Sequence, residues 1–254
     1  MADGNPIATV MGLFDPYNRV ARVYPSLIAL GPIAWSAVVL FPSIFTSIAN
    51  GAGFVVATTC VFYFLASITR SLGKRVEPKL LNLWGGWPTT LLLQHRNSVL
   101  DPLTKARYHK ELGFLCGLNP PSATDEAADG VAADHFYRTS TKKLIEQRRD
   151  AKYRLLHGEN ASYGFRRNLY GLKPVAVVET LIVMTLTGFG WWLITPQPYT
   201  RLIVAESVIH YPFFPVLLGV DFGYLLVWFW AITPTFVFQA GREYGEALLR
   251  TLDA

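Results

Sequence analysis

The chain runs from residue 23 to residue 69 without a single Lys, Arg, Asp or Glu, and most of these 47 residues are apolar. A helix of about 20 apolar residues crosses the hydrocarbon core of a bilayer. The stretch therefore has room for two passes and a short turn. We predict a first span over residues 24–45, kinked near Pro32, and a second over residues 52–69, with Asn50-Gly51 in the turn between them.

A second apolar region follows Lys173. Its hydropathy predicts a third span from residue 174 to about 195 and a fourth over about residues 216–240, so the second hairpin covers residues 174–240. Residues 202–215 are apolar but contain Glu206, His210 and two prolines, which favours an interfacial or re-entrant segment. The pattern predicts an all-α integral membrane protein whose four transmembrane helices form two hairpins, residues 24–69 and 174–240, with a helical domain inserted between them.

The inserted domain, residues 70–173, carries clear helix signals. Asp101-Pro102 has the pattern of an N-cap followed by Pro at the first helical position, and Gly117 is placed to end that helix after Cys116. We expect a loop over residues 119–130 and a long helix over about residues 131–156, because apolar positions recur there with helical spacing.

Charge predicts the orientation. Residues 70–173 contain eighteen of the chain's 23 Lys and Arg against ten acidic residues, a net charge of +8. Basic loops stay on the cytoplasmic side of a membrane. We therefore expect the insert, the N-terminal segment 1–23 and the tail 241–254 to be cytoplasmic, in a multi-pass protein.

Composition excludes several classes of protein. Hydrophobic residues make up 51% of the chain and charged residues 16%, and no secretory signal is visible at the start. The two cysteines form no disulfide framework. No HExxH, CxxC, G-x-S-x-G or P-loop occurs, and the five histidines are not paired at helical spacing. We expect no catalytic residues, no metal site and no cofactor, and so a protein that is not an enzyme.

Basic residues of the insert are the candidate ligand-binding surface. They lie among aromatic residues, a combination that can hold phosphates and stack bases. They can equally face anionic lipid headgroups, bind a partner protein, or serve only to keep the loop inside. The candidates are Arg138, Lys142, Arg149, Lys152, Arg166 and Arg167.

Two acidic residues lie inside predicted spans, Glu179 in the third and Asp221 in the fourth. Charged groups at membrane depth are costly and face a bundle interior or a water-filled cavity. A structural ion pair and a pore-lining role both fit this position. The candidate basic partners are Lys173 and Arg167 for Glu179, and Arg201 and His210 for Asp221.

Gly219 and Gly223 have the spacing of a small-residue contact between membrane helices. Asp221 lies between them, which favours a helix contact within one chain or between copies. We expect a homo-oligomer in contact with membrane lipids.

Three sequence segments of the inserted domain resemble those of a known family: GGWPTTLLLQHRN (85–97), DPLTKARYHKEL (101–112) and YGFRRNLYGLKP (163–174). Together with the four-span layout, they resemble the Hailong-type membrane effectors of bacterial antiphage operons, over about residues 70–175. The resemblance implies a homo-oligomeric ion channel of the bacterial inner membrane. It also implies that an oligonucleotide made by a partner nucleotidyltransferase holds the channel closed, and that infection opens it.

The expected function is therefore an antiphage-defence channel gated through its basic cytoplasmic domain by an oligonucleotide. A vestibule lined by Arg166 and Arg167 would favour anions. Two alternatives stay open. The chain can be a membrane-anchored binding or scaffold protein that conducts nothing, or a membrane transporter or enzyme that uses Glu179 and Asp221.

Overall fold

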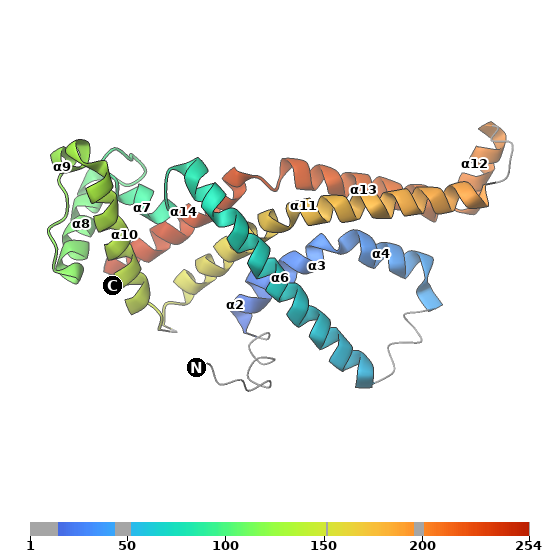
Figure 1. Cartoon of the computed structure of the whole chain (residues 1–254), viewed down its shortest axis with the longest axis horizontal. Coiled ribbons are helices and arrows are strands. Elements are labelled where there is room, and N and C mark those ends of the chain that lie inside the picture. Colours follow the sequence, from blue (N-terminus) through green and yellow to red (C-terminus); the bar gives the residue numbers. More distant parts are fainter. Residues whose placement is uncertain (1–14, 44–51, 151, 196–200, 254) are drawn as a thin grey trace. The chain divides into compact units, whose positions relative to one another are not determined.

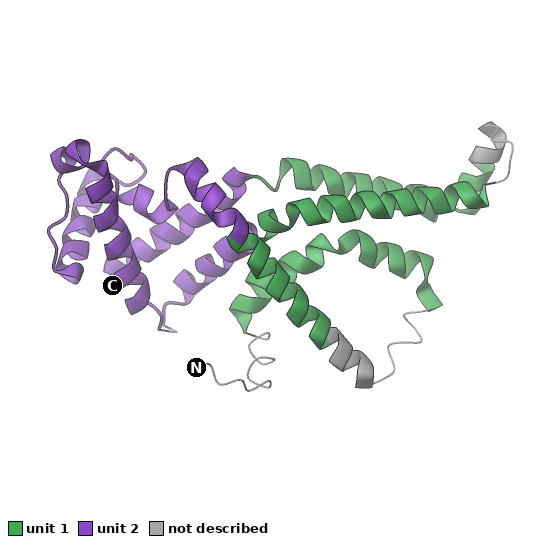
Figure 2. Ribbon diagram, in the orientation of Figure 1, with its two compact units in different colours: residues 1–74, 168–233 green, residues 75–167, 234–254 purple. Residues whose placement is uncertain are grey.

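The computed structural model describes residues 15–43, 52–150, 152–195 and 201–253, with backbone alone for residues 52–58 and 201–205. The described residues form helices joined by short connections (Figure 1). Two compact units can be distinguished (Figure 2). Unit 1 is residues 1–74 and 168–233, and unit 2 is residues 75–167 and 234–254. Over the described residues, the prediction of an all-helical protein is confirmed.

Unit 1 begins with a bent helical segment. Unit 1 also includes the first part of α6 and the larger part of α11. Each of these two long helices has its remaining residues in unit 2. The helices are α2 (Pro16–Asn18), η1 (Arg19–Val23), α3 (Tyr24–Ala29), α4 (Gly31–Leu40), α6 (Ala52–Trp84), α11 (Arg154–Ile194), α12 (Arg201–His210) and α13 (Phe213–Trp230).

Helices α11 and α13 run side by side in opposite directions (Figure 1). Near one end a Cβ added at Gly190 would lie 3.5 Å from the Phe214 ring. Near the other end Lys173 Nζ donates to the Ile232 carbonyl, which follows α13, at 2.9 Å. The predicted third and fourth spans therefore pack directly on each other.

Within unit 1, α6 and α11 meet where both helices carry glycine. A Cβ at Gly171 would lie 2.8 Å from backbone atoms of Leu72 and Gly73, so the two backbones are almost in contact. Asn168, fully buried beside this crossing, donates from Nδ2 to the Ala21 carbonyl at 2.6 Å. The amide thus ties η1 to the crossing of α6 and α11.

Length and hydropathy identify two described helices that can cross a membrane, α11 and α13. The segments Pro16–Ala29 and Gly31–Leu40, bent by 54°, become a third if the pair is one broken span. The predicted second span, residues 52–69, coincides with the start of α6, and the side chains of residues 52–58 lie outside the described part. Two or three candidate spans suggest a membrane protein.

Unit 2 is built on a core contributed by several short helices. Its elements are the remainder of α6 and α11 together with α7 (Pro88–Leu93), α8 (Pro102–Cys116), α9 (Ala123–Ala128), α10 (Gly130–Gln147), α14 (Pro234–Arg250) and η2 (Thr251–Asp253). Tyr137, Leu144 and Leu248 are completely buried in this core. Gly245 lets α14 approach α7, since a Cβ there would lie 3.0 Å from Thr89 Cα.

A buried lysine fixes the chain between α7 and α8. Lys105 Nζ donates to the carbonyls of Gln94 at 2.8 Å and His95 at 3.3 Å, and also to that of Asn97. His109, one helical turn further along α8, bonds through Nε2 to the Leu93 carbonyl at 2.7 Å. Burial lowers the pKa of both Lys105 and His109, because removal from water disfavours the charged form.

The predicted helix 102–116 is confirmed. Asp101 Oδ1 caps it by accepting from the Thr104 amide at 2.9 Å, and Gly117 ends it with φ +67°. The predicted loop 119–130 is wrong in part, because it contains α9. The Ser122 and Asp125 side chains and backbone amides form a reciprocal capping box there, a pattern that was present in the sequence.

The predicted long helix 131–156 is also wrong at its far end. Helix α10 stops at Gln147, and the Arg148 guanidinium turns to Thr251, donating from Nε to Oγ1 at 3.2 Å. Arg149 and Lys152 therefore lie after α10 and not on it. The next helix, α11, starts at Arg154 and continues through Pro174 without a break, so the expected boundary at residue 173 lies inside a helix.

The last predicted span also differs from the structure. Helix α13 ends at Trp230, ten residues before the expected end, and α14 begins at Pro234. The residue before a proline is disfavoured in a helix, which explains the interruption at Thr233. Residues 234–254, expected in part as a tail, belong to unit 2. Of residues 202–215, α12 covers the first part as a short helix.

Several predictions fall on residues outside the described part of the chain. They are residues 1–14 of the N-terminal segment, the turn at Asn50-Gly51 and the loop 196–200.

Candidate functional sites: a polar helix break and a basic pocket

The first candidate site lies in unit 1, where the N-terminal helix is interrupted. Leu30 has φ −94° and ψ 10°, outside the helical region, and separates α3 from α4. Pro32 has no amide hydrogen, so the Ile28 carbonyl loses the donor that a regular helix supplies. Ile33 lies in the first turn of α4, where amides have no partner within the helix. The kink predicted at Pro32 is confirmed, and it leaves the Ile28 carbonyl and the Ile33 amide without the partners that a regular α-helix would supply.

Side chains from α11 and α13 satisfy both groups. The Ile33 amide donates to Glu179 Oε1 at 2.9 Å, and the Tyr224 hydroxyl donates to the Ile28 carbonyl. A carboxylate at this position also faces the positive end of the α4 dipole. Glu179 therefore acts as an N-terminal cap supplied by another helix.

Asp221 is the most buried acid at this site. It is 0% exposed, and its Oδ1 accepts from the Trp35 indole Nε1 at 2.8 Å. Its Oδ2 has no hydrogen-bond partner among the described residues. The Trp35 ring also contacts the Tyr224 ring edge to face, with centroids 5.2 Å apart. Trp35 thus joins the broken segment to two residues of α13.

The basic partners expected for these acids are not found in the described part of the chain. Arg167 pairs with Glu77, and Lys173 donates to the Ile232 carbonyl. His210 Nδ1 bonds to the carbonyl of Glu206 at 3.0 Å, and the Arg201 side chain lies outside the described residues. Asp221 and Glu179 are instead bonded to neutral donors, an indole and a backbone amide.

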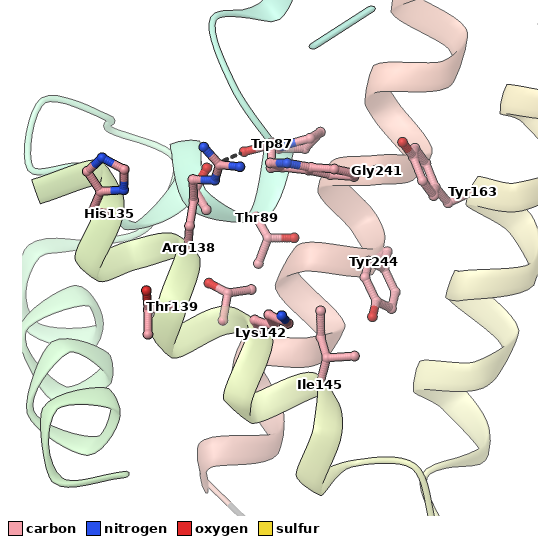
Figure 3. Close-up of a pocket in the computed structure, with 13 residues that line it drawn as sticks. Trp87, Thr89, His135, Arg138, Thr139, Lys142, Ile145, Tyr163, Gly241 and Tyr244 are labelled. Carbon is pink, nitrogen blue, oxygen red and sulfur yellow. Dashed lines mark hydrogen bonds between the residues drawn. The ribbon is translucent and has the colours of Figure 1, made fainter. Parts of the chain in front are cut away.

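The second candidate site is a pocket of about 510 Å³ in unit 2 (Figure 3). Helix α10 forms one wall, and the remaining walls come from α7 with the preceding Trp87, α11 and α14. Two cations, Arg138 and Lys142, project from α10, and both are exposed. The residues that line the pocket are Trp87, Pro88, Thr89, Thr90, His135, Arg138, Thr139, Thr141, Lys142, Ile145, Tyr163, Gly241 and Tyr244.

Three aromatic residues and several threonine hydroxyls accompany the cations. Trp87, Tyr163 and Tyr244 come from three different segments, and the Thr90 hydroxyl donates to the Trp87 carbonyl at 2.8 Å. Gly241 leaves room for this arrangement, since a Cβ there would lie 2.8 Å from Pro88 Cγ. A second hollow of about 630 Å³ shares Trp87, Thr90, His135 and Arg138 with the pocket. Arg138 therefore lines two adjacent cavities.

Acidic side chains near the pocket are engaged elsewhere. Glu77 pairs with Arg167, and Glu243 pairs with Arg166 at 3.6 Å. Asp134 accepts a hydrogen bond from Gln94 Nε2 at 2.9 Å. Among the described residues, neither Arg138 nor Lys142 forms an ion pair. The two cations are therefore available to an anionic ligand.

The structure brings only two of the six predicted basic residues to the pocket, Arg138 and Lys142. Arg166 and Arg167 lie on α11 and are neutralised by glutamates. Arg149 is exposed beyond the end of α10, and Lys152 lies over the Tyr153 ring, 5.0 Å from its centroid. Of the pocket's aromatic residues, Tyr163 lies beside the basic residues in the sequence, but sequence reasoning missed Trp87 and Tyr244, because they come from distant segments that only the packing of unit 2 brings together.

Comparison with known protein families, with curated proteins and with solved structures finds no match for this chain. The fold and the two sites define its class: an all-helical protein with two or three candidate membrane-spanning helices.

Proposed function

We propose that this chain is a subunit of a homo-oligomeric ion channel in the bacterial inner membrane, gated by an oligonucleotide and acting in antiphage defence. In this proposal it crosses the membrane four times, through the broken segment Pro16–Leu40, the start of α6, α11 and α13. Both termini and unit 2 face the cytoplasm, as the positive charge of residues 70–173 favours.

The polar helix break is the observation that carries the channel proposal. Non-helical backbone at membrane depth is tolerated where protein buries it or where it lines a water-filled cavity. Buried carboxylates inside candidate spans mark ion pathways in many membrane proteins. Glu179 and Asp221 meet the same broken segment, two residues apart at Ile33 and Trp35. This is a polar, interrupted site among candidate membrane-spanning helices.

The pocket in unit 2 supports the ligand part of the proposal. Arg138 and Lys142 would hold phosphates, and Trp87, Tyr163 or Tyr244 would stack on a base. Helix α11 carries Tyr163 of the pocket and Glu179 of the break on one continuous helix. Ligand binding that displaces α11 would therefore act on the hydrogen bond between Glu179 and the Ile33 amide.

Two glycines on α13, Gly219 and Gly223, support the proposal that the chain forms oligomers. A Cβ added at Gly219 or Gly223 would meet nothing within 4 Å, so no other described helix packs closely on these glycines. Their neighbours Val216 and Val220 are 61% and 48% exposed. Because small residues permit close helix contact in lipid, we propose that this face packs against a second copy.

The structure gives no support for a preference for anions. The expectation of anion conduction depended on free cations at Arg166 and Arg167, and in the structure both pair with glutamates.

The test is ion flux and ligand binding with the full-length protein in liposomes. We expect flux through wild-type protein and its inhibition by an oligodeoxynucleotide. Arg138→Ala with Lys142→Ala should weaken oligonucleotide binding at least tenfold, whereas the matched control Lys143→Ala on the same helix should not. Binding should also weaken steeply with salt, because phosphate contacts release counterions.

Each failure has a distinct meaning. Ion-tight liposomes with intact binding would favour a scaffold protein. Flux without any oligonucleotide binding would retain the channel and reject the ligand. Saturable uptake of a solute without ion conductance, abolished by Asp221→Asn or Glu179→Gln with unchanged assembly, would favour a transporter.

A further inference from the structure

The break between α3 and α4 is held from outside the helix. Pro32 accounts for one missing hydrogen bond, at the Ile28 carbonyl, but proline alone does not fix the direction or size of the bend. The observed bend is 54°. At this bend, each of the two backbone groups freed by the break is bonded by a side chain of a different helix.

A straighter segment has an alternative set of bonds. The Ile33 amide would then reach the Ala29 carbonyl, four residues earlier, as in any α-helix. The bent form therefore exchanges one backbone bond for bonds to Glu179 and Tyr224, together with the bond from Trp35 to Asp221. Two arrangements that exchange one set of hydrogen bonds for another lie close in free energy, as the two states of a conformational switch do.

Trp35 links the bend to these contacts. A Cβ at Gly31 would lie 2.5 Å from Trp35 Cζ3, so the indole lies directly against the backbone at the break. The same ring contacts Tyr224 and bonds to Asp221. A change in the angle between α3 and α4 therefore breaks either the contacts of Trp35 with α13 or the bond from Tyr224 to the Ile28 carbonyl.

We propose that the Leu30–Gly31 break is a switchable joint: Glu179, Tyr224 and Asp221 hold α4 bent, and release of their hydrogen bonds lets the segment straighten. The joint goes beyond the proposed channel function and does not depend on it, because its two states are defined by the shape of one segment in any membrane environment.

The experiment measures the bend in the full-length protein, reconstituted in nanodiscs, by pulsed electron spin resonance. Cys60 and Cys116 are replaced by Ser, and spin labels are placed through Arg19→Cys and Val39→Cys, at two exposed positions. With a rise of about 1.5 Å per residue, removing the 54° bend lengthens this separation by about 3 Å.

Three variants distinguish the joint from a fixed kink. Glu179→Leu combined with Tyr224→Phe removes both partners of the broken backbone and should shift the distance distribution upward by about 3 Å. Glu179→Gln is the matched control, since its side-chain oxygen still accepts from Ile33, and it should keep the short distance. Pro32→Ala restores the missing amide while the side-chain bonds remain, and it should also keep the short distance.

The opposite pattern overturns the proposal. A short distance in the Glu179→Leu, Tyr224→Phe variant together with a long distance in Pro32→Ala would show that proline alone sets the bend. If the double variant does not fold, Tyr224→Phe alone still tests the joint, because it removes one hydroxyl and keeps the ring. It should add a longer-distance population that is absent from wild type, and an unchanged distribution would count against the joint.

Discussion

The Trp35 indole donates a hydrogen bond of 2.8 Å to Asp221, a residue 186 positions further along the chain. Asp221 is completely buried, and the indole satisfies Oδ1 while Oδ2 has no partner among the described residues. A charged or polar group buried without partners is costly. The indole therefore stabilises the packing of α4 on α13 as well as the acid.

Removing this donor should destabilise the protein. We expect Trp35→Phe to lower the free energy of unfolding by about 1–3 kcal/mol, the cost of leaving a buried polar group unsatisfied. Thermal unfolding in detergent, followed by the fluorescence of the other tryptophans, measures the effect. Trp230→Phe, at a ring that is 79% exposed, is the matched control and should change little. Equal melting temperatures for Trp35→Phe and Trp230→Phe would contradict the role given to Trp35.

The crossing of α6 and α11 gives a second prediction, with a control on the same helix. Gly171→Ala would place a Cβ 2.8 Å from backbone atoms of Leu72 and Gly73, and backbone cannot move aside as a flexible side chain can. Gly158→Ala, also on α11, meets nothing within 4 Å. We expect Gly171→Ala to cost about 1–3 kcal/mol, as overpacking does, and Gly158→Ala to stabilise by up to about 1 kcal/mol through helix propensity. Calorimetry of the two purified variants tests the difference, and the reverse order would show that the helices do not approach so closely.

Local sequence signals predicted local structure well. Asp101 and Gly117 fixed both ends of α8, and Pro32 marked the break in the first helix, because caps and proline effects depend on a few neighbouring residues. The ends of α10 and α13 were missed. Arg148 leaves α10 to bond Thr251, a residue 103 positions away, and α14 packs into unit 2. The residues near the ends of α10 and α13 in the sequence give no indication of either long-range contact.

The same contrast between local sequence signals and long-range contacts holds for the candidate sites. Arg138, Lys142, Glu179 and Asp221 stood out in the sequence by charge and position. Their surroundings did not. Trp35 became a partner of Asp221 only through the packing of α4 on α13, and the rings of the pocket come from segments far apart in the chain. Residue type identified the polar groups, and tertiary structure supplied what they bond to.

Lys105 gives a third prediction, for unit 2. Its amine donates to three backbone carbonyls between α7 and α8, and it is 5% exposed. Lys105→Met keeps the aliphatic stem but leaves the carbonyls without this donor. We expect a loss of about 1–3 kcal/mol in unfolding free energy and faster amide hydrogen exchange over residues 94–97. Lys110→Met, at an exposed position of the same helix, should leave both unchanged. Slow exchange retained in Lys105→Met would show that the lysine does not hold this connection.

His109 predicts how stability depends on pH. The ring is 4% exposed, and burial lowers its pKa below the ordinary value of 6.5. It faces His95 at 4.8 Å between ring centroids and stacks on Tyr137 at 5.4 Å, with Lys105 and Glu126 as the nearby charges. The fold therefore favours the neutral imidazole, and protonation would add a second buried cation near Lys105.

Because the unfolded chain binds this proton more readily, the contribution of His109 is complete above about pH 6.5 and is lost as the pH falls below it. The slope for one proton is at most about 1.4 kcal/mol per pH unit. We expect the melting temperature of the detergent-solubilised protein to fall between about pH 7.5 and pH 5.5. His109→Gln, which can still donate to the Leu93 carbonyl but does not titrate, should flatten that fall. An identical pH profile in His109→Gln and wild type would assign the acid sensitivity to other groups, and a rise in stability on acidification would contradict the predicted direction.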